Sequence, residues 1–573
     1  MTIRQVIADH RFQAGAVFVV ALLRFVNLGY VDLQPWDESL YAVRAETIVQ
    51  YGDWLDQTPH SIGGIYSSTH PPLYVWLTSI AYRTFGINEF SARFFSALFG
   101  AGTIILVYFF GRRFFGSKTG FIAAMFLGLN PFYTFWTRQG QFDATLIFFL
   151  TLAAFLYLLS LESSKPWPYY LGTGVALGLG LLTKLFVCLI FPVVALATML
   201  AFDRPRWPRH FQAVIVSTAI ALAIALPWHV IMTLRHGLGN PLYYFAVSQL
   251  AERTFVGIEG NVKALGPLYF PNRLVVALPY AVFFFLHRCW RLFKESNSLA
   301  EPFLFLWFWL YAIAITVMRT RLAVYILPLF IPVMLLAARS VESTMKGEVP
   351  RRVHLILLGL TAVALGWATK LEWRMAAKAA LAAFLQLHLP PTADLYTAAV
   401  FILLSIFLAL VLYEIEKGER THRWVTDRLL PLILIPLSLI FLASVVILDT
   451  MRYDDGAKDL AALVNDRSYT ELYVVGAEQN PQLTFYLNGA DIGWDPGRFA
   501  KRLPLKGGVD RIRTFLERRM SQPGQFFVVV ERYELRAQGM LGYGRLLPSG
   551  FELSFESSGY FLFQKQEFFA RTD

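Results

Sequence analysis

Long apolar segments separated by short polar connections recur along most of the chain. A helix needs roughly 17–25 mainly apolar residues to cross a bilayer, and about thirteen segments approach or reach that length. Cations interrupt the apolar runs at Lys184 and at Arg319 and Arg321, which predicts tight turns between neighbouring spans. The pattern therefore predicts a polytopic α-helical membrane protein. The expected spans are about 12–29, 90–111, 118–136, 142–161, 168–183, 184–202, 210–233, 272–290, 301–318, 322–338, 353–371, 396–413 and 428–448.

The pattern changes after about Met451, where charge rises and long apolar runs stop. Two short apolar runs are typical of buried strands, one segment has amphipathic helical spacing, and one alternates as a hairpin does. We expect a transmembrane domain over 1–449 and a small soluble α/β domain over 450–573. The strands are expected at 472–475 and 526–530, the helix at 509–519 and the hairpin at 551–563.

The polar segment at about 30–89 is too long to be a simple connection. Residues 39–51 have helical spacing, and residues 71–85 are apolar but short, with Trp76 and Tyr82 suited to a membrane interface. Both are predicted to be helices that lie along the membrane surface. A turn rich in small and polar residues separates them at 63–72.

Composition supports a membrane protein and argues against a soluble enzyme. The 573 residues are 56% hydrophobic and 16% charged, whereas an ordinary soluble domain is about 45–50% apolar and about 25% charged. The net charge of +11 comes from basic residues scattered over short loops, as the positive-inside rule requires, so no nucleic-acid partner is predicted. Cys188 and Cys289 lie in apolar runs and indicate neither a disulfide framework nor a metal motif.

The distribution of basic residues also predicts an orientation. With the N-terminus in the cytoplasm, the basic short loops face the cytoplasm and the long loops at about 30–89, 234–271 and 372–395 face outward. No small-residue cleavage site follows the first apolar run, so it is interpreted as a retained helix. An odd number of spans then places the C-terminal domain outside. The expected location is a bacterial cytoplasmic (inner) membrane, with that domain periplasmic or extracellular.

Ionisable residues gather on the predicted outer face. They are Asp37, Glu38, His70, Arg138, Asp143, Lys184, Arg253, Arg319 and Arg321, with Tyr325 beside them. Ionisable groups in or at a membrane are costly, so a functional role is the first hypothesis. Structural alternatives remain for several of them: Asp143 as an N-cap, Lys184 and the arginines as snorkelling helix ends, and His70 as a turn residue.

Carboxylates and cations on one face of a membrane suit a particular kind of chemistry. Cations at the lipid boundary suit a phosphate anchored by a lipid tail. A carboxylate suits a general base that deprotonates a hydroxyl group. Transfer of a sugar from a polyprenyl phosphate to an acceptor hydroxyl needs both, because positive charge stabilises the departing phosphate.

A metal is an open alternative for the same carboxylates. Asp37, His70 and Asp143 offer oxygen and imidazole ligands that would suit a divalent cation. Nothing in their spacing demands one, so the need for a divalent metal stays undecided at this level.

Several motifs follow one another along residues 30–330. They are Trp36-Asp37-Glu38, Tyr51-Gly52-Asp53-Trp54, His70-Pro71-Pro72-Leu73-Tyr74, Arg138 to Asp143, Leu182-Thr183-Lys184, Pro227-Trp228 and Tyr325-Ile326-Leu327-Pro328. In this order they resemble the GT-C membrane glycosyltransferases, in particular the superfamily of protein O-mannosyltransferases and 4-amino-4-deoxy-L-arabinose lipid A transferases, similar to bacterial glycosyltransferase family 39. The resemblance implies a GT-C fold, a polyprenyl-phosphate-linked sugar donor, and a lipid, glycan or protein acceptor.

The resemblance also implies roles for individual residues. Asp37 would be the catalytic carboxylate that acts as base on the acceptor hydroxyl, and Asp143 the second acidic position. Near the donor phosphate would lie Lys184, Arg253, Arg321 and Tyr325. Supporting or acceptor-side roles would fall to Glu38, His70 and Arg138.

This chain departs from the arabinose transferases at two of the matched motifs. Those proteins carry an arginine three residues after the catalytic aspartate, where this chain has Leu40. They carry Glu-Lys before the two prolines, where this chain has Thr69-His70. The sugar, the acceptor and any metal site of that subfamily therefore do not follow from the resemblance.

Two other classes of protein compete with a transferase. A transporter or flippase of lipid-linked saccharides would share the membrane setting, but transporters often contain inverted repeats with broken helices, and no such symmetry is visible. A membrane-anchored adhesion or scaffolding module would need far fewer spans than this chain has. The long first loop with its carboxylates favours the enzyme.

Overall fold

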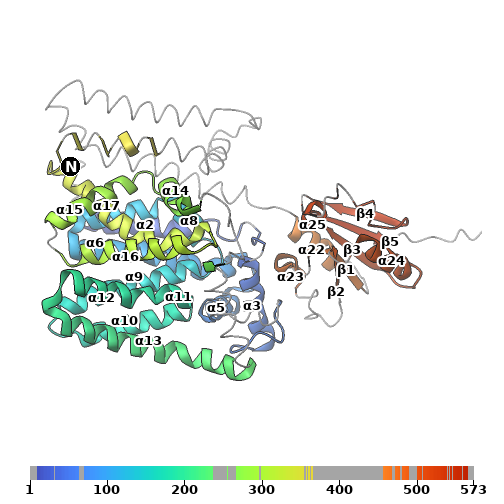
Figure 1. The fold of residues 1–573 in the computed structure, drawn as a ribbon. Helices are drawn as coiled ribbons and strands as arrows, with labels where there is room; N and C mark the ends of the chain where they lie inside the picture. Colours follow the sequence, from blue (N-terminus) through green and yellow to red (C-terminus); the bar gives the residue numbers. More distant parts are fainter. Residues whose placement is uncertain are drawn as a thin grey trace, which may run out of the picture. The chain divides into compact units, whose positions relative to one another are not determined.

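The structure is a computed structural model, shown in Figure 1. It describes residues 10–364 and 456–565 with interior gaps, the longest of which are 63–69, 237–253, 256–265 and 489–499. The chain divides into two compact units, one holding residues 1–28, 69–74 and 93–450, and the other 29–68, 75–92 and 451–573. Apart from residues 69–74, the first long loop thus belongs to the same compact unit as the C-terminal segment.

The larger unit is built from apolar helices (Figure 1). Within the described residues, five helices are long and apolar enough to cross a membrane, and a bent pair would add a sixth. The predicted spans at 396–413 and 428–448, and most of 353–371, lie outside the described residues, so the count of about thirteen stays a prediction. The helices are α2 (His10–Leu22), η1 (Leu23–Phe25), α6 (Glu89–Phe115), α7 (Ser117–Gly128), α8 (Pro131–Thr137), α9 (Asp143–Glu162), α10 (Trp167–Leu181), α11 (Leu185–Cys188), α12 (Ile190–Phe202), η2 (Arg204–Arg206), α13 (Trp207–His236), η4 (Gly266–Leu268), α14 (Tyr269–Ala277), α15 (Val282–Glu295), α16 (Ala300–Val317), η5 (Ala323–Ile326) and α17 (Leu327–Met345).

Two of the segments predicted as spans are broken helices in the structure. The segment at 118–136 is divided between α7 and α8, and the segment at 272–290 between α14 and α15, which meet at an angle of 109°. The buried side chain of Asn130 serves both breaks. Its oxygen accepts the Tyr133 amide at 2.8 Å, which caps α8, and its amide donates to the Ala277 carbonyl at 2.7 Å, at the end of α14.

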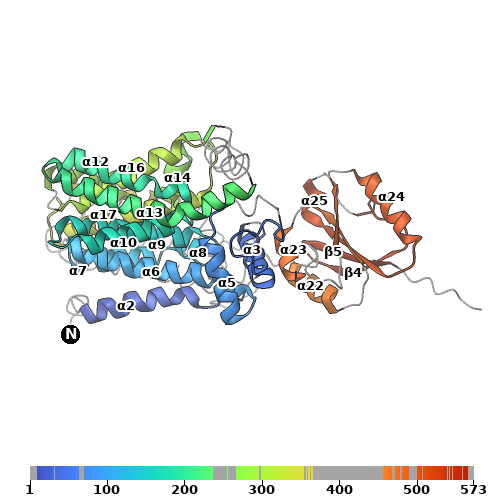
Figure 2. The same cartoon turned by 90° about the horizontal axis from the view of Figure 1, so that it is seen from below.

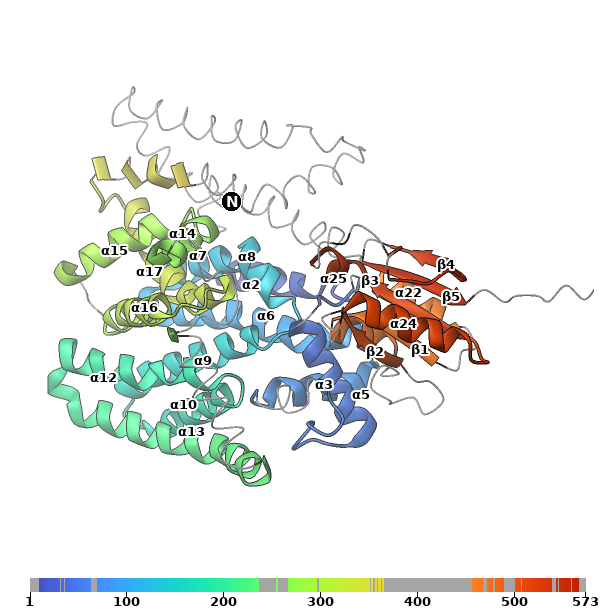
Figure 3. The ribbon, with the colours of Figure 1, turned by 45° about the vertical axis from the view of Figure 1, so that its right-hand side comes forward.

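Helices α9, α10 and α13 pack side by side (Figure 3). Glycines on α10 allow a close approach, because a Cβ at Gly174 would lie 2.6 Å from the Ile220 Cβ. A Cβ at Gly178, one turn later, would lie 2.8 Å from the Ile224 Cβ. Small residues at such contacts are typical of membrane helix pairs.

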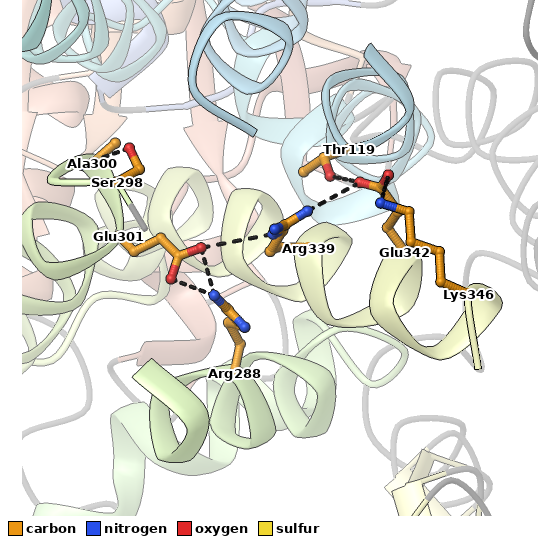
Figure 4. A network of polar contacts seen from close by, with 8 residues as sticks. All are labelled: Thr119, Arg288, Ser298, Ala300, Glu301, Arg339, Glu342 and Lys346. Atoms are coloured by element: carbon orange, nitrogen blue, oxygen red, sulfur yellow. Dashed lines mark hydrogen bonds and ion pairs between the residues drawn. The ribbon is translucent and has the colours of Figure 1, made fainter. Parts of the chain in front are cut away.

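A polar network joins α7, α15, α16 and α17 (Figure 4). The Arg288 Nη2 lies 2.7 and 2.5 Å from the two carboxylate oxygens of Glu301, and both side chains are buried. Arg339 lies 3.7 Å from both Glu301 and Glu342, and Lys346 lies 2.9 Å from Glu342. The hydroxyl of Thr119 donates to Glu342. These contacts fix the four helices relative to one another.

The first long loop contains helices α3 (Asp37–Tyr51) and α5 (Leu73–Phe85). The helical structure of both segments is therefore confirmed, with α3 beginning two residues earlier than expected, while their place along the membrane surface stays a prediction. Gly52, with a φ of 77°, ends α3 by leaving the right-handed region. The Ser79 hydroxyl of α5 donates to the Ala45 carbonyl of α3 at 3.0 Å.

The C-terminal segment forms a mixed five-stranded sheet in the order β2-β1-β3-β5-β4. Strand β1 pairs in parallel with β2 and β3, whereas β5 pairs antiparallel with β3 and β4. The predicted strands, helix and hairpin correspond to β1, β3, α24 and the β4–β5 pair. The elements are α22 (Ala457–Asp466), β1 (Glu471–Gly476), α23 (Pro481–Tyr486), β2 (Ala500–Pro504), α24 (Val509–Met520), β3 (Phe526–Glu531), α25 (Arg532–Ala537), β4 (Phe551–Glu556) and β5 (Tyr560–Lys565).

Alternation along the strands gives the sheet two apolar faces. Val474 and Val529 face α22 and α23, whereas Val475 and Val528 face α24. Figure 2 shows α22 and α23 on one side of the sheet and α24 on the other. The two helical layers bury both faces, which explains the nearly continuous apolar sequence of β3.

Candidate active site

Lys184 lies in the turn between α10 and α11, as the interruption of the apolar run predicted. The amides of Thr183 and Lys184 both donate to the Gly180 carbonyl, at 3.0 and 2.9 Å, which closes the end of α10. Gly180 leaves room for the returning chain, because a Cβ there would lie 2.6 Å from the Cys188 sulfur. Lys184 itself is extended, with φ −155° and ψ 103°.

The ammonium group of Lys184 is surrounded by one carboxylate and two aromatic rings. Its Nζ lies 3.4 Å from the Asp143 Oδ1, 4.7 Å from the centre of the Phe142 ring and 5.2 Å from that of Tyr325. The Asp143 side chain is 9% exposed and that of Lys184 is 28% exposed. A cation in this setting is partly desolvated and is held by charge and by the ring faces.

Asp143 is the first residue of α9, where the helix dipole favours a negative charge. The N-cap position is occupied by Phe142, which makes no capping bond through its side chain. The alternative of Asp143 as an N-cap is therefore wrong, and its carboxylate is directed to Lys184.

Tyr325 lies in η5, in the turn that leads into α17. Its ring stacks on Phe270, with centres 6.5 Å apart, and its buried face meets Lys184. The turn is held in part by the Arg319 amide, which donates to the Thr254 carbonyl at 3.1 Å. Arg319 is exposed and Arg321 is half-buried in the same turn.

His70 and the residues after it join this part of the bundle. The His70 ring stacks on Phe142 with centres 6.3 Å apart, and the Leu73 amide donates to the Leu182 carbonyl at 3.1 Å. The Ser96 hydroxyl donates to the Gln141 carbonyl at 2.6 Å. The segment that follows His70 and the turn before Asp143 are therefore fixed to one scaffold.

Arg138 lies at the end of α8 and is buried. Its Nη1 donates to the carbonyl oxygens of Arg24, at 3.1 Å, and Leu23, at 3.4 Å. These bonds satisfy carbonyl groups at the end of η1. Of the two roles considered for Arg138, the geometry favours the supporting one.

In the smaller unit, Asp37 is the first residue of α3 and is exposed. Its neighbour Glu38 is fully buried, and the Glu38 carboxylate accepts the Gln34 amide at 2.7 Å. Asp37 therefore presents its carboxylate at the surface of this unit, whereas Glu38 fixes the chain that precedes the helix.

Arg253 and Trp36 lie outside the described residues. Within the described part of the chain, no three His, Cys, Asp or Glu side chains lie close enough together to hold a metal. The structure thus brings together Asp143, Lys184, Tyr325 and His70 around Phe142, while Asp37 and Glu38 belong to the other unit.

Phe142 is the site residue that the sequence reasoning missed. Its ring contacts the imidazole ring of His70 and the ammonium group of Lys184. An aromatic residue directly before an acidic one at a helix start was visible in the motif. Its role was not, because cation–π contacts depend on where a distant lysine lies.

Comparison with known proteins shows which proteins this chain is similar to. A sequence model described as dolichyl-phosphate-mannose-protein mannosyltransferase matches residues 69–231. An undecaprenyl phosphate-alpha-4-amino-4-deoxy-L-arabinose arabinosyl transferase of Aeromonas salmonicida is 30% identical over 357 residues, which cover 59% of this chain and 63% of that one. Its counterpart in Wigglesworthia glossinidia brevipalpis is 26% identical, over 58% of this chain and 59% of its own length. In both cases less than two thirds of the relative is matched.

Solved structures share the fold over nearly the whole chain. The crystal structure of ArnT from Cupriavidus metallidurans bound to undecaprenyl phosphate superposes with a TM-score of 0.67 at 19% identity, covering 96% of this chain and 97% of that one. The oligosaccharyltransferase of Archaeoglobus fulgidus gives a TM-score of 0.50 at 14% identity, over 90% and 69%. The chain has the fold of GT-C enzymes and is similar in sequence to the superfamily of protein O-mannosyltransferases and 4-amino-4-deoxy-L-arabinose lipid A transferases.

Proposed function

We propose that the protein is a membrane glycosyltransferase that moves a sugar from a polyprenyl-phosphate donor to a hydroxyl group of a lipid A, cell-envelope glycan or protein acceptor. The observation that carries the proposal is the partly desolvated Lys184 ammonium between Asp143, Phe142 and Tyr325. A phosphate is the ligand that such a cation at a membrane suits. The related ArnT of Cupriavidus metallidurans was crystallised with undecaprenyl phosphate.

In the proposed reaction, the phosphate leaves the anomeric carbon as the acceptor oxygen attacks it. Asp37 takes the proton of the acceptor hydroxyl, which makes the oxygen a better nucleophile. Lys184, with Arg321 and Arg253, holds the phosphate and stabilises the charge that develops on it. Asp143 and Tyr325 keep the Lys184 ammonium in place before the donor binds.

The proposed setting is the outer face of the bacterial cytoplasmic membrane. The short loops that carry basic residues fall on one side of the expected spans. The long loops that carry acidic residues fall on the other side. In this arrangement residues 1–449 form the membrane domain, and the α/β segment within 450–573 lies in the periplasm. Both the orientation and this division are part of the proposal.

The test is transfer activity of the purified protein with radiolabelled polyprenyl-phosphate sugars. Asp37→Asn is expected to abolish transfer at normal protein abundance, because the amide cannot accept the proton. Asp510→Asn is the matched control, since Asp510 also lies in the first turn of a helix and is exposed. Full transfer by Asp37→Asn would overturn the assignment of the base.

The alternative function is transport or flipping of a lipid-linked saccharide. A flippase would move the labelled lipid between leaflets of a vesicle without changing its mass. A transferase would produce a new glycosylated acceptor and free polyprenyl phosphate. Mass spectrometry of glycolipids and glycoproteins from cells with and without the gene distinguishes the two, and a missing pentose or hexose names the sugar.

A further inference from the structure

Both backbone polar groups of Leu33, a buried residue of the first loop, are bound by side chains of α23. The Leu33 amide donates to the Tyr486 hydroxyl oxygen at 2.8 Å. The Leu33 carbonyl accepts the Gln482 side-chain amide at 2.8 Å. Gln482 and Tyr486 are four residues apart and therefore lie on one face of the helix. One face of α23 thus holds both the backbone amide and the backbone carbonyl of Leu33.

Helix α23 is itself anchored to the sheet. The Asn480 side chain accepts the Leu483 amide at 2.9 Å and so caps the helix. Its amide nitrogen donates to Glu531, at the end of β3, at 2.9 Å and to the Tyr560 hydroxyl of β5 at 3.0 Å. The cap therefore fixes the start of α23 to two strands at once.

Glu531 strengthens this anchor. Its buried carboxylate accepts the Ala477 amide at 2.8 Å, directly after β1, and the Arg502 guanidinium of β2 at 3.3 Å. Gly476 has no room for a side chain, because a Cβ there would overlap the Glu531 carboxylate. The carboxylate is thus bonded to groups from several strands and cannot shift without breaking them.

The far end of α23 is held as well. The Tyr486 hydroxyl donates to the Glu89 carboxylate at 3.3 Å, and the Lys458 ammonium of α22 lies 2.5 Å from the same oxygen. The Tyr486 hydroxyl therefore accepts one bond and donates another, which satisfies it fully. Through Glu89 it joins the end of the first loop to its beginning at Leu33.

The path from Leu33 to Asp37 is short. The next residue, Gln34, donates its amide to Glu38 at 2.7 Å, and the Ser39 hydroxyl donates to the Gln34 carbonyl. Four residues span at most about 14 Å, so a displaced Leu33 shifts the first turn of α3. We propose that Gln482 and Tyr486 of the C-terminal α/β segment are positioning residues, which hold Leu33 and thereby set the orientation of Asp37.

This inference rests on the proposed function, in which Asp37 is the base. A misplaced base slows proton transfer without changing how the donor is held, so the effect falls on kcat and leaves the donor KM unchanged. A lower kcat at an unchanged donor KM distinguishes a positioning role from a general loss of structure. It also gives the α/β segment a part in catalysis although none of its residues meets the substrate.

The test uses Tyr486→Phe and Gln482→Met in the full-length protein. Each substitution keeps the size of the side chain and removes one bond to Leu33. Each is expected to lower kcat about 10-fold or more, since a misplacement on the order of 1 Å is costly in catalysis. Hydrogen exchange at residues 32–35 is expected to speed up roughly 5- to 30-fold, as the loss of one buried bond allows.

Two control variants remove polar groups elsewhere in the same segment. Tyr473→Phe removes a hydroxyl that bonds to Glu471, and Gln522→Met changes a glutamine that follows α24. Both are expected to keep kcat and the exchange rates at 32–35. Equal loss of kcat in the controls, or a parallel rise in donor KM for Tyr486→Phe and Gln482→Met, would overturn the positioning role.

Failure of the inference and failure of the proposed function give different results. If Asp37→Asn stays active, the proposed base is wrong, and hydrogen exchange still reports whether α23 holds the loop. If Asp37→Asn is inactive while Tyr486→Phe and Gln482→Met keep the wild-type kcat, the function stands and the positioning role is overturned. Unchanged exchange at 32–35 in both variants would also overturn it.

Discussion

At the scale of single residues, the environment of Lys184 suits the phosphate-binding role that we propose for it. The ammonium is paired with Asp143 but only at 3.4 Å, and two ring faces supply the rest of its environment. A longer ion pair loses less interaction energy when a phosphate replaces part of the contact between Lys184 and Asp143. The ring faces remain beside the cation in either state.

Lys184→Met removes the charge and keeps the apolar stem. We expect kcat/KM for transfer to fall about 100- to 1,000-fold, in line with the loss of one preorganised donor to a developing anion. Lys184→Arg should retain more activity than Lys184→Met because it keeps the charge. Lys165→Met, at an exposed loop lysine, is the control and should leave the rate unchanged.

Glu46 is a buried carboxyl group on α3, and burial raises its pKa to about 8. The folded protein therefore holds the proton more tightly than the unfolded chain, whose glutamate has a pKa near 4.5. Stability contributed by the neutral acid is complete below pH 4.5 and is lost as the pH rises through about 8.

Glu46→Gln mimics the neutral acid and cannot ionise. We expect its melting temperature to match that of the wild type near pH 5 and to exceed it by several degrees near pH 9, measured by thermal unfolding in detergent. Glu552→Gln, at an exposed glutamate, should show no such pH-dependent difference. A constant difference from pH 5 to pH 9 would contradict the burial-driven shift.

At the scale of helices, the contact between α10 and α13 depends on glycine. The Cβ of an alanine at Gly174 would lie 2.6 Å from the Ile220 Cβ and 2.9 Å from the Ser217 carbonyl oxygen. Neither is the end of a flexible side chain, so the helices would have to separate. Membrane helices associate through such packing, because lipid offers no hydrophobic drive to bring them together.

Gly174→Ala should therefore destabilise the protein by about 1–3 kcal/mol, the usual cost of overpacking. Gly15→Ala in α2 is the matched control, since no atom lies within 4 Å of the added Cβ. There the better helix propensity of alanine should be neutral or stabilise by up to about 1 kcal/mol. The melting temperatures of the two variants are measured in the same detergent. Equal shifts in melting temperature would contradict a role of the close α10–α13 packing in stability.

At the scale of the whole molecule, charged side chains gather near both ends of helices α16 and α17. Helices α16 and α17 begin or end near Tyr325 at one end and reach the Arg288–Glu301 network at the other. The 19 residues of α17 span about 28 Å. The network of Figure 4 is thus distant from the candidate active site and joins four helices.

Glu301→Gln would leave the buried Arg288 without its counter-charge. We expect a loss of about 3–5 kcal/mol of stability, as for other broken buried pairs. Glu162→Gln is the control, because Glu162 and its partner Arg113 are 40% and 50% exposed, and a surface pair is worth about 0–1 kcal/mol. The melting temperature and the monodisperse fraction after gel filtration measure both. A similar small effect for the two variants would contradict the structural role of the network.

The sequence by itself determined the features that depend on neighbouring positions. Apolar periodicity predicted β1, β3, α24 and the β4–β5 hairpin, and single charges in apolar runs predicted the turns at Lys184 and Arg319. The motifs also indicated the superfamily. These features are local, because the period of a pattern states which face of an element is buried.

Only the tertiary structure decided what each buried face meets. The breaks at Asn130 and Ala277 depend on one side chain that serves two distant helix ends. The cluster around Phe142 joins residues from four turns. The bonds from Leu33 to Gln482 and Tyr486 join positions more than 440 residues apart in sequence. A periodic pattern carries no information about such partners, since long-range contacts form only when separate elements pack together.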